Sequence, residues 1–134
     1  SNPVEFSVNE DVRGYTVGVY GPSNTSRSLE KIRDELGELT IEMKADDESG
    51  FRKLSLGRVD AVFSNRDVGN DMVARLGLQN IRYAGAQRSL NYYIGFSKAH
   101  NSANVVERFN TRLETLITDG SVNEILSLHN MVLR

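Results

Sequence analysis

The sequence lacks cysteine altogether and contains only two histidines, His100 and His129, among its 134 residues. A disulfide and a zinc site built from Cys and His are therefore excluded. Acidic residues at 46–48 are the remaining candidates for metal ligands, and they are more typical of a helix N-terminus than of a calcium cage. We therefore expect no metal site and no cofactor.

Basic residues are not in excess. The chain has 16 Lys and Arg against 18 Asp and Glu, a net charge of -2, and the basic residues are scattered, which argues against a nucleic-acid-binding surface. No apolar run approaches the roughly 20 residues that a membrane-spanning helix needs. Neither of the two common glycine-rich phosphate loops is present, so the sequence does not support nucleotide binding.

The chain does contain alternating strand-like and helix-like segments. β-rich runs such as YTVGVY at 15–20 are followed by stretches with apolar residues at helical spacing. The expected strands are 15–20, 39–43, 60–64, 81–84 and 90–96, and the expected helices are 23–37, 46–57, 65–77, 105–118 and 121–132. The last helix is expected to open with a capping box formed by Ser121 and Glu124. This order predicts an α/β fold in which helices flank a mainly parallel sheet, followed by two C-terminal helices.

Two loops that follow predicted strands are the candidate sites, because ligands of open α/β sheets bind beyond the carboxyl ends of the strands. The first loop, 21–26, reads GPSNTS and places the polar side chains of Ser23, Asn24 and Thr25 at a helix N-terminus. The backbone N–H groups at such a terminus bind carboxylates and other anions. The alternative is simple capping of the helix, which the same residue types favour.

The second loop, 64–67, follows the predicted strand at 60–64 and opens the next helix. Asn65 can both donate and accept hydrogen bonds, and Arg66 can hold a carboxylate with two parallel bonds. The alternative is that Asn65 caps the helix while Arg66 pairs with Asp67 or another acid at the surface.

A catalytic constellation is not evident in the sequence. His100 lies in a polar turn and His129 on the last predicted helix, and neither stands beside a recognisable nucleophile motif. No acid/base pair is recognisable elsewhere. We therefore expect that the protein is not an enzyme.

Four segments occur in an order and at intervals that match a known family. They are 12–19 (VRGYTVGV), 54–62 (LSLGRVDAV), 93–98 (YIGFSK) and 109–125 (FNTRLETLITDGSVNEI). Together these segments resemble the C-terminal portion of the family 3 extracellular solute-binding proteins, which have the type II periplasmic-binding-protein fold. The resemblance covers nearly the whole chain.

The resemblance implies a clamp of two lobes that close on a small ligand. Residues 1–9 are then an N-terminal lead-in, 10–90 the second lobe, 91–98 a hinge strand, and 99–134 the closing helices of the first lobe. The N-terminal portion of that first lobe lies outside this sequence, so we expect the chain to be a fragment of the clamp.

The resemblance also implies roles for four residues. Ser23, Asn24 and Thr25 match the turn whose N–H and hydroxyl groups bind the ligand carboxylate. Asn65 matches an aspartate that holds the ligand ammonium group, and here the side chain carries no charge.

The expected function is capture of a small polar ligand, an amino acid or a related small carboxylate or amine, for an ABC importer in the bacterial periplasm. Ligand-bound protein would dock on the importer's permease or on a membrane sensor. The alternatives are the ligand-sensing domain of a membrane-bound signalling receptor, a dehydratase-like enzyme on the same fold, and an effector-binding domain of a cytoplasmic transcription regulator. We also expect a homodimer through the exposed C-terminal helices, because two amphipathic helices without their partners leave an apolar patch.

Overall fold

The computed structural model describes residues 5–129 and 131–133, and the chain divides into two compact units. The N-terminal unit is Ser1–Ser89 and the C-terminal unit is Leu90–Arg134. Each unit is described by itself. Their predicted assignment to the two lobes of a clamp stays a prediction.

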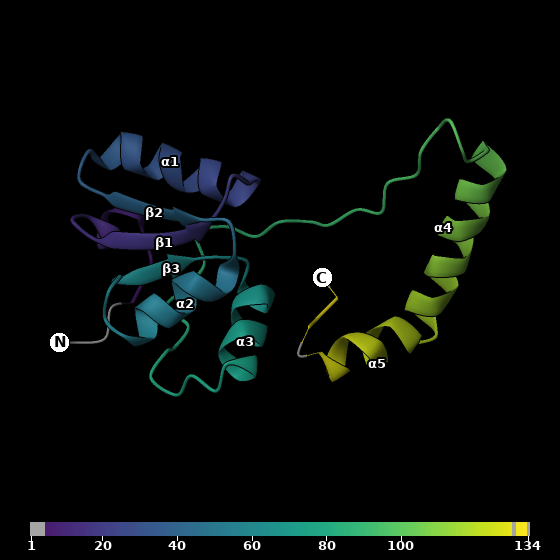
Figure 1. Ribbon diagram of the computed structural model, residues 1–134. Coiled ribbons are helices and arrows are strands. Elements are labelled where there is room, and N and C mark those ends of the chain that lie inside the picture. The colour runs from purple at the N-terminus through teal and green to yellow at the C-terminus, as the bar shows by residue number, and fades with distance from the viewer. Residues whose placement is uncertain (1–4, 130, 134) are drawn as a thin grey trace. The chain divides into compact units, whose positions relative to one another are not determined.

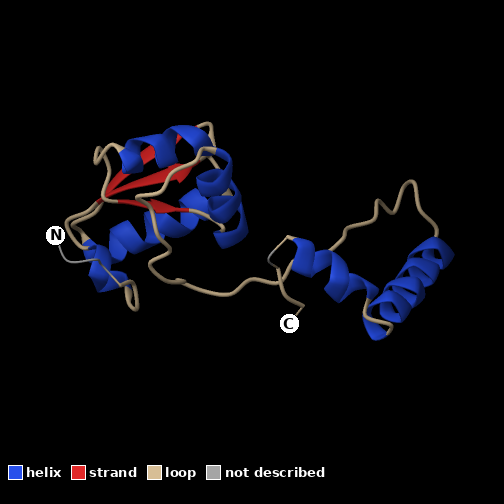
Figure 2. Ribbon diagram, turned by 90° about the horizontal axis from the view of Figure 1, so that it is seen from below, coloured by secondary structure: helices blue, strands red, loops and turns tan. Residues whose placement is uncertain are grey.

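The N-terminal unit is built on a parallel sheet of three strands in the order β2-β1-β3. The strands are β1 (Thr16–Tyr20), β2 (Thr40–Lys44) and β3 (Ala61–Phe63), which lie side by side in Figure 2. In the register of the sheet, Val19 of β1 faces Met43 on one side and Phe63 on the other. The first three predicted strands are confirmed, and so is the α/β fold with a parallel sheet.

Helix α1 (Asn24–Leu36) covers one face of this sheet (Figure 1). Its residues Leu29, Ile32 and Leu36 recur at helical spacing and form the main core with Val17 and Val19 of β1. Leu29 is only 1% exposed. The helix ends at Gly37, whose φ of 72° lies in the left-handed region that glycine tolerates best.

Helices α2 (Asp47–Ser55) and α3 (Arg66–Arg75) lie on the opposite side of the sheet (Figure 1). Helix α2 approaches β1 closely, because a Cβ atom at Gly18 would lie 3.6 Å from the Cα of Gly50. Helix α3 packs against α2, where a Cβ atom at Gly69 would lie 3.3 Å from the ring of Phe51. Gly18 and Gly50 have no side chains, so β1 and α2 approach closely, and Gly69 leaves room for the ring of Phe51 between α2 and α3.

A short 3-10 helix, η1 (Asn9–Val12), precedes the first strand. The next residue, Arg13, donates a hydrogen bond from Nη1 to the carbonyl of Leu36 at 2.7 Å, so it satisfies a backbone acceptor at the end of α1. These contacts lie at the amino-terminal edge of the sheet, away from the loops that follow the strands.

The C-terminal unit contains two helices, α4 (Ala103–Thr118) and α5 (Ser121–Leu128), as predicted. The rings of Phe96 and Phe109 meet edge to face with centroids 5.0 Å apart. The predicted capping box at Ser121 is wrong, because Gly120 is the N-cap residue and the N–H of Ser121 donates to Asp119 at 2.9 Å. The last helix also ends at Leu128, earlier than predicted. Among the described residues, no helix has the length and apolarity needed to cross a membrane.

The fourth and fifth predicted strands, 81–84 and 90–96, are wrong. Both segments are irregular, and the described part of the C-terminal unit has no strand (Figure 2). Among the described residues, the first makes a single backbone bond to a segment distant in the sequence, from the N–H of Phe6 to the carbonyl of Ala84 at 3.0 Å. In the second, Tyr93 is 86% exposed. A strand needs a neighbouring strand to complete its hydrogen bonds, and a β-rich composition alone does not supply one.

Candidate ligand-binding site

The carboxyl-terminal edge of the sheet is the candidate site. The neighbouring strands β1 and β3 end together there, and the chain leaves them toward opposite faces, to α1 after β1 and to α3 after β3 (Figure 1). Such a position is the topological switch point of an open α/β sheet, where ligands of this fold class bind. The two loops predicted from the sequence flank this switch point.

The first loop is held in place by Ser23, the N-cap residue of α1. Its Oγ accepts the N–H of Ser26 at 3.1 Å and donates to the carbonyl of Tyr20 at 2.9 Å. In return the Oγ of Ser26 accepts the N–H of Ser23 at 2.9 Å. Gly21, which is joined to Pro22 by a cis peptide bond, donates its N–H to the carbonyl of Lys44 at 2.9 Å. The alternative of helix capping is therefore correct for the Ser23 hydroxyl.

The next two residues of this loop have backbone N–H groups that can still donate hydrogen bonds. Asn24 and Thr25 are the first two residues of α1, and their backbone N–H groups donate to no acceptor within residues 5–129 and 131–133. The first N–H groups of a helix have no partner inside it, and they carry the positive end of the helix dipole. The side chain of Asn24 is exposed and its Oδ1 accepts a bond of 3.3 Å from Arg27. This loop therefore presents two backbone donors at the switch point.

The second loop is organised in the same way by Asn65, the N-cap residue of α3. Its Oδ1 accepts the N–H groups of Asp67 at 2.9 Å and Val68 at 3.4 Å. The Nε of Arg66 lies 3.3 Å from Oδ1 of Asp67, in an ion pair at the surface. Capping by Asn65 and pairing of Arg66 with Asp67, both considered as alternatives, are present in the structure. The outer guanidinium nitrogens of Arg66 have no acceptor in the described chain, so they can still reach a carboxylate.

Sequence reasoning did not select two further residues at this edge. Asp46 follows β2 and is the N-cap residue of α2, where its two carboxylate oxygens accept the N–H and the hydroxyl of Ser49 at 2.7 and 2.8 Å. These bonds hold the pKa of the Asp46 carboxyl below its usual value. Its interpretation as a helix N-terminal charge is confirmed. Tyr20, the last residue of β1, is the second residue, and it is 44% exposed.

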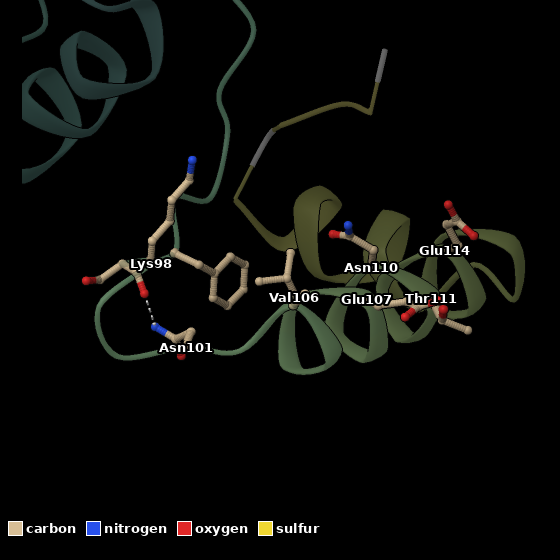
Figure 3. A pocket seen from close by; sticks show the side chains of 10 residues that line it. Lys98, Asn101, Val106, Glu107, Asn110, Thr111 and Glu114 are labelled. Atoms are coloured by element: carbon tan, nitrogen blue, oxygen red, sulfur yellow. Dashed lines mark hydrogen bonds between the residues drawn. The ribbon is translucent and has the colours of Figure 1, made fainter.

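The C-terminal unit carries a shallow groove along α4 (Figure 3). Its lining combines the apolar side chains of Phe96 and Val106 with the charged side chains of Lys98, Glu107 and Glu114. The groove contains none of the residues selected from the sequence. In the part of the chain that the structure describes, no three His, Asp or Glu side chains gather closely enough to hold a metal ion.

The fold is an open α/β sheet with helices on both faces and a switch point between β1 and β3. A scan against protein-family models finds no match, and a search of curated proteins finds none. Solved structures do match, and they include amino-acid-binding proteins and a substrate binding domain of an amino acid transporter. The match agrees with the predicted fold of a solute-binding protein and confirms it.

Three solved structures illustrate the match. An ancestral arginine-binding protein bound to arginine has a TM-score of 0.72 and 24% identity over 95% of this chain, and the same kind of protein bound to glutamine has a TM-score of 0.68 and 24% identity over 93%. The second substrate binding domain of a predicted amino acid ABC transporter from Streptococcus pneumoniae has a TM-score of 0.63 and 22% identity over 92%. The chain spans about half the length of these structures, 54%, 53% and 57% respectively. At these identities the likeness establishes the fold.

Proposed function

We propose that the chain is part of a family 3 solute-binding protein, which captures an amino acid or a related small carboxylate or amine between two lobes. The observation that carries this proposal is the arrangement at the switch point, where the first turns of α1 and α3 meet the ends of β1 and β3. The amino acids bound by the solved structures of the same fold support the ligand class.

The residues at the switch point are suited to bind the carboxylate group of the ligand. The unpaired N–H groups of Asn24 and Thr25 carry the positive end of the α1 dipole, and Arg66, which is paired with Asp67 through Nε, offers its outer guanidinium nitrogens from the neighbouring loop. A carboxylate held by such charge-assisted hydrogen bonds is bound more strongly than by neutral ones.

Asn65 bears on where the ammonium group of the ligand binds. Its Oδ1 already accepts two backbone N–H groups and bears no charge, so it offers little to a ligand ammonium group. We therefore assign the carboxylate end of the ligand to the N-terminal unit, and the partner groups for an ammonium to residues outside this unit.

The finer parts of the proposal concern the setting of the protein. We propose delivery of the ligand to an ABC importer in the periplasm, with docking of the bound form on its permease, and no catalytic activity. Pairing of two copies through α4 and α5 stays a prediction.

Titration calorimetry on the purified protein tests the binding role. The panel contains arginine, glutamine, a small dicarboxylate and a small amine without a carboxylate. We expect saturable binding of at least one carboxylate-bearing compound and none of the amine alone. Absence of binding across the panel contradicts the proposal.

A charge variant tests the assigned location of the carboxylate. Ser23→Asp preserves helix capping, since Asp and Ser are comparable N-cap residues, but it places a negative charge beside the N–H groups of Asn24 and Thr25. We expect the Kd to rise about tenfold or more, because like charges in contact oppose binding. The control Glu35→Gln changes one exposed charge in the last turn of α1, away from the switch point, and should change the Kd by less than about threefold.

A further inference from the structure

Met43 of the edge strand β2 has its side chain against the start of the first loop. Ile41 and Met43 pack against the core on the side of α1. The residue between them, Glu42, forms an ion pair with Lys53 of α2 on the opposite side of the sheet. A Cβ atom built at Gly21 would lie 2.6 Å from Sδ and 2.8 Å from Cγ of Met43. The thioether therefore fills the space next to the first residue of the loop.

The first loop is bonded to β2 at this point. Gly21 donates its N–H to the carbonyl of Lys44, the neighbour of Met43, at 2.9 Å. A Cβ atom at Gly21 would also lie 2.9 Å from Cβ of Ser26, whose hydroxyl accepts the N–H of Ser23. Protein interiors packed this tightly transmit a change in one side chain to its neighbours. A change at the sulfur of Met43 is therefore passed to the residues that position the N–H groups of the candidate site.

The three methionines of the chain differ in their surroundings. Met43 is partly buried on an edge strand, so solvent reaches the residue. Met72 of α3 is only 8% exposed, and its sulfur accepts a bond of 3.1 Å from Arg75. Met131 follows α5 in the C-terminal unit. Among the described contacts, those of Met43 combine access to solvent with a position against the first loop.

We propose that Met43 is an oxidation-sensitive switch of the first loop: a peroxide converts its thioether to the sulfoxide, and the sulfoxide displaces the loop. The sulfur lone pair attacks one oxygen of hydrogen peroxide, so that an S–O bond forms as the O–O bond breaks. The proton of the transferred oxygen passes to the departing hydroxide, which leaves as water. The sulfur is thereby oxidised and the peroxide reduced. Methionine sulfoxide reductases return the thioether, so the switch is reversible.

The sulfoxide does not fit the space that the thioether fills, because it is polar and carries one more atom. If the oxidised side chain stays in place, it adds bulk where Gly21 already has no room for a Cβ atom. If it turns out to solvent, the loop loses its contact with Met43. Both outcomes move Ser23, Asn24 and Thr25, which follow directly. The loss of ligand affinity rests on the proposed function, whereas the displacement of the loop does not.

The test uses the purified protein and a variant that keeps Met43 as its only methionine, Met72→Leu combined with Met131→Leu. Each is treated with hydrogen peroxide, and peptide mass spectrometry shows which methionines have gained an oxygen atom. Oxidation of Met43 should lower the midpoint of urea denaturation on the order of 1 M and shift the amide resonances of Gly21 and Ser26. It should weaken the binding of arginine or glutamine about three- to tenfold, the loss expected when one hydrogen bond to the ligand is weakened. Methionine sulfoxide reductases should reverse all three changes.

Met43→Leu is the matched control, because leucine has a volume close to that of methionine and no sulfur to oxidise. Peroxide should leave the urea midpoint and the Kd of this variant at their values before treatment.

Three results overturn the inference about Met43 while leaving the proposed function intact. The first is that Met43 escapes oxidation at peroxide doses that oxidise Met131. The second is that its sulfoxide forms but leaves the urea midpoint and the loop amides unchanged. The third is that treated Met43→Leu changes as much as the treated wild-type protein. If the loop responds as expected but the untreated protein binds no carboxylate, the proposed function fails and the switch in the loop stands.

Discussion

Gly21 lies at the start of the first site loop, in a space that has no room for a side chain. A Cβ atom built at Gly21 would lie 2.6 Å from Sδ and 2.8 Å from Cγ of Met43, and 2.9 Å from Cβ of Ser26. Carbon atoms in contact normally stand about 3.5–4.0 Å apart. The Met43 side chain can move, but Ser26 is 1% exposed and belongs to the capping box of α1. Gly21→Ala must therefore displace the helix or the loop.

The magnitude follows from comparison with Gly18, which lies in the same strand-and-loop segment. At Gly18 a Cβ atom would lie 3.5 Å from Cγ2 of Val62 and 3.6 Å from Cα of Gly50, which are ordinary contacts. Either Gly→Ala change restricts the unfolded chain by a similar amount, so that contribution cancels between the two variants. The remaining difference is the overpacking at Gly21, about 1–3 kcal/mol.

Urea denaturation followed by far-UV circular dichroism measures this difference. With a denaturant dependence of about 1–3 kcal/mol per molar urea, the midpoint of Gly21→Ala should lie on the order of 1 M below that of Gly18→Ala. Gly21→Ala should also weaken ligand binding, because Ser23, Asn24 and Thr25 follow directly. Equal midpoints for the two variants would refute the close approach of the loop, Met43 and α1.

Two further predictions concern the core and the pH dependence of stability. Leu29→Ala should lower the free energy of unfolding by about 2–5 kcal/mol, because Leu29 is 1% exposed, whereas Leu128→Ala at 78% exposure should change it by less than about 0.5 kcal/mol. If denaturation curves showed a similar decrease in the free energy of unfolding for both variants, the assignment of Leu29 to the core would be contradicted. The pKa of Asp46 is lowered by its bonds to Ser49, so its contribution to stability is fully present above the unfolded-state pKa of about 3.9 and is lost as the pH falls through the folded-state pKa. Asp46→Asn should therefore lose less stability on acidification than the wild-type protein, and identical acid titrations would contradict this.

Local patterns predict the sheet and its helices well. The alternation in 15–20, the hydroxyls at 23–26 and the glycine at 37 each specify a boundary by short-range chemistry, and β1 and α1 form where these signals lie. Leu29, Ile32 and Leu36 face the core because their spacing leaves no other apolar stripe on that helix.

The segment 90–96 shows why local patterns fail elsewhere. Its composition favours a strand, yet in the structure Tyr93 and its neighbours are exposed and irregular. Strand formation depends on a partner strand that can be distant in the chain, and composition does not reveal whether one is present.

The candidate site stays a prediction, and the structure shows which bonds its residues make within the chain. Ser23 and Asn65 were selected because they stand at helix starts after strands, and the structure uses both side chains as caps. Ser, Thr and Asn are common both as helix caps and as ligand-binding residues at helix N-termini, so residue type cannot separate the two roles. Tyr20 was missed because its exposure depends on how the helices cover the sheet, which the alternation of β1 does not determine.

Backbone amide chemical shifts during a ligand titration test the central claim, that the ligand binds at the switch point between β1 and β3. The titration uses arginine, with glutamine as the second ligand. The account predicts that the largest shifts fall on the amides of Asn24, Thr25 and Arg66, while those of Gly14 and Gly37 at the opposite edge remain unchanged. Shifts concentrated instead along the α4 groove, around Val106, would contradict it.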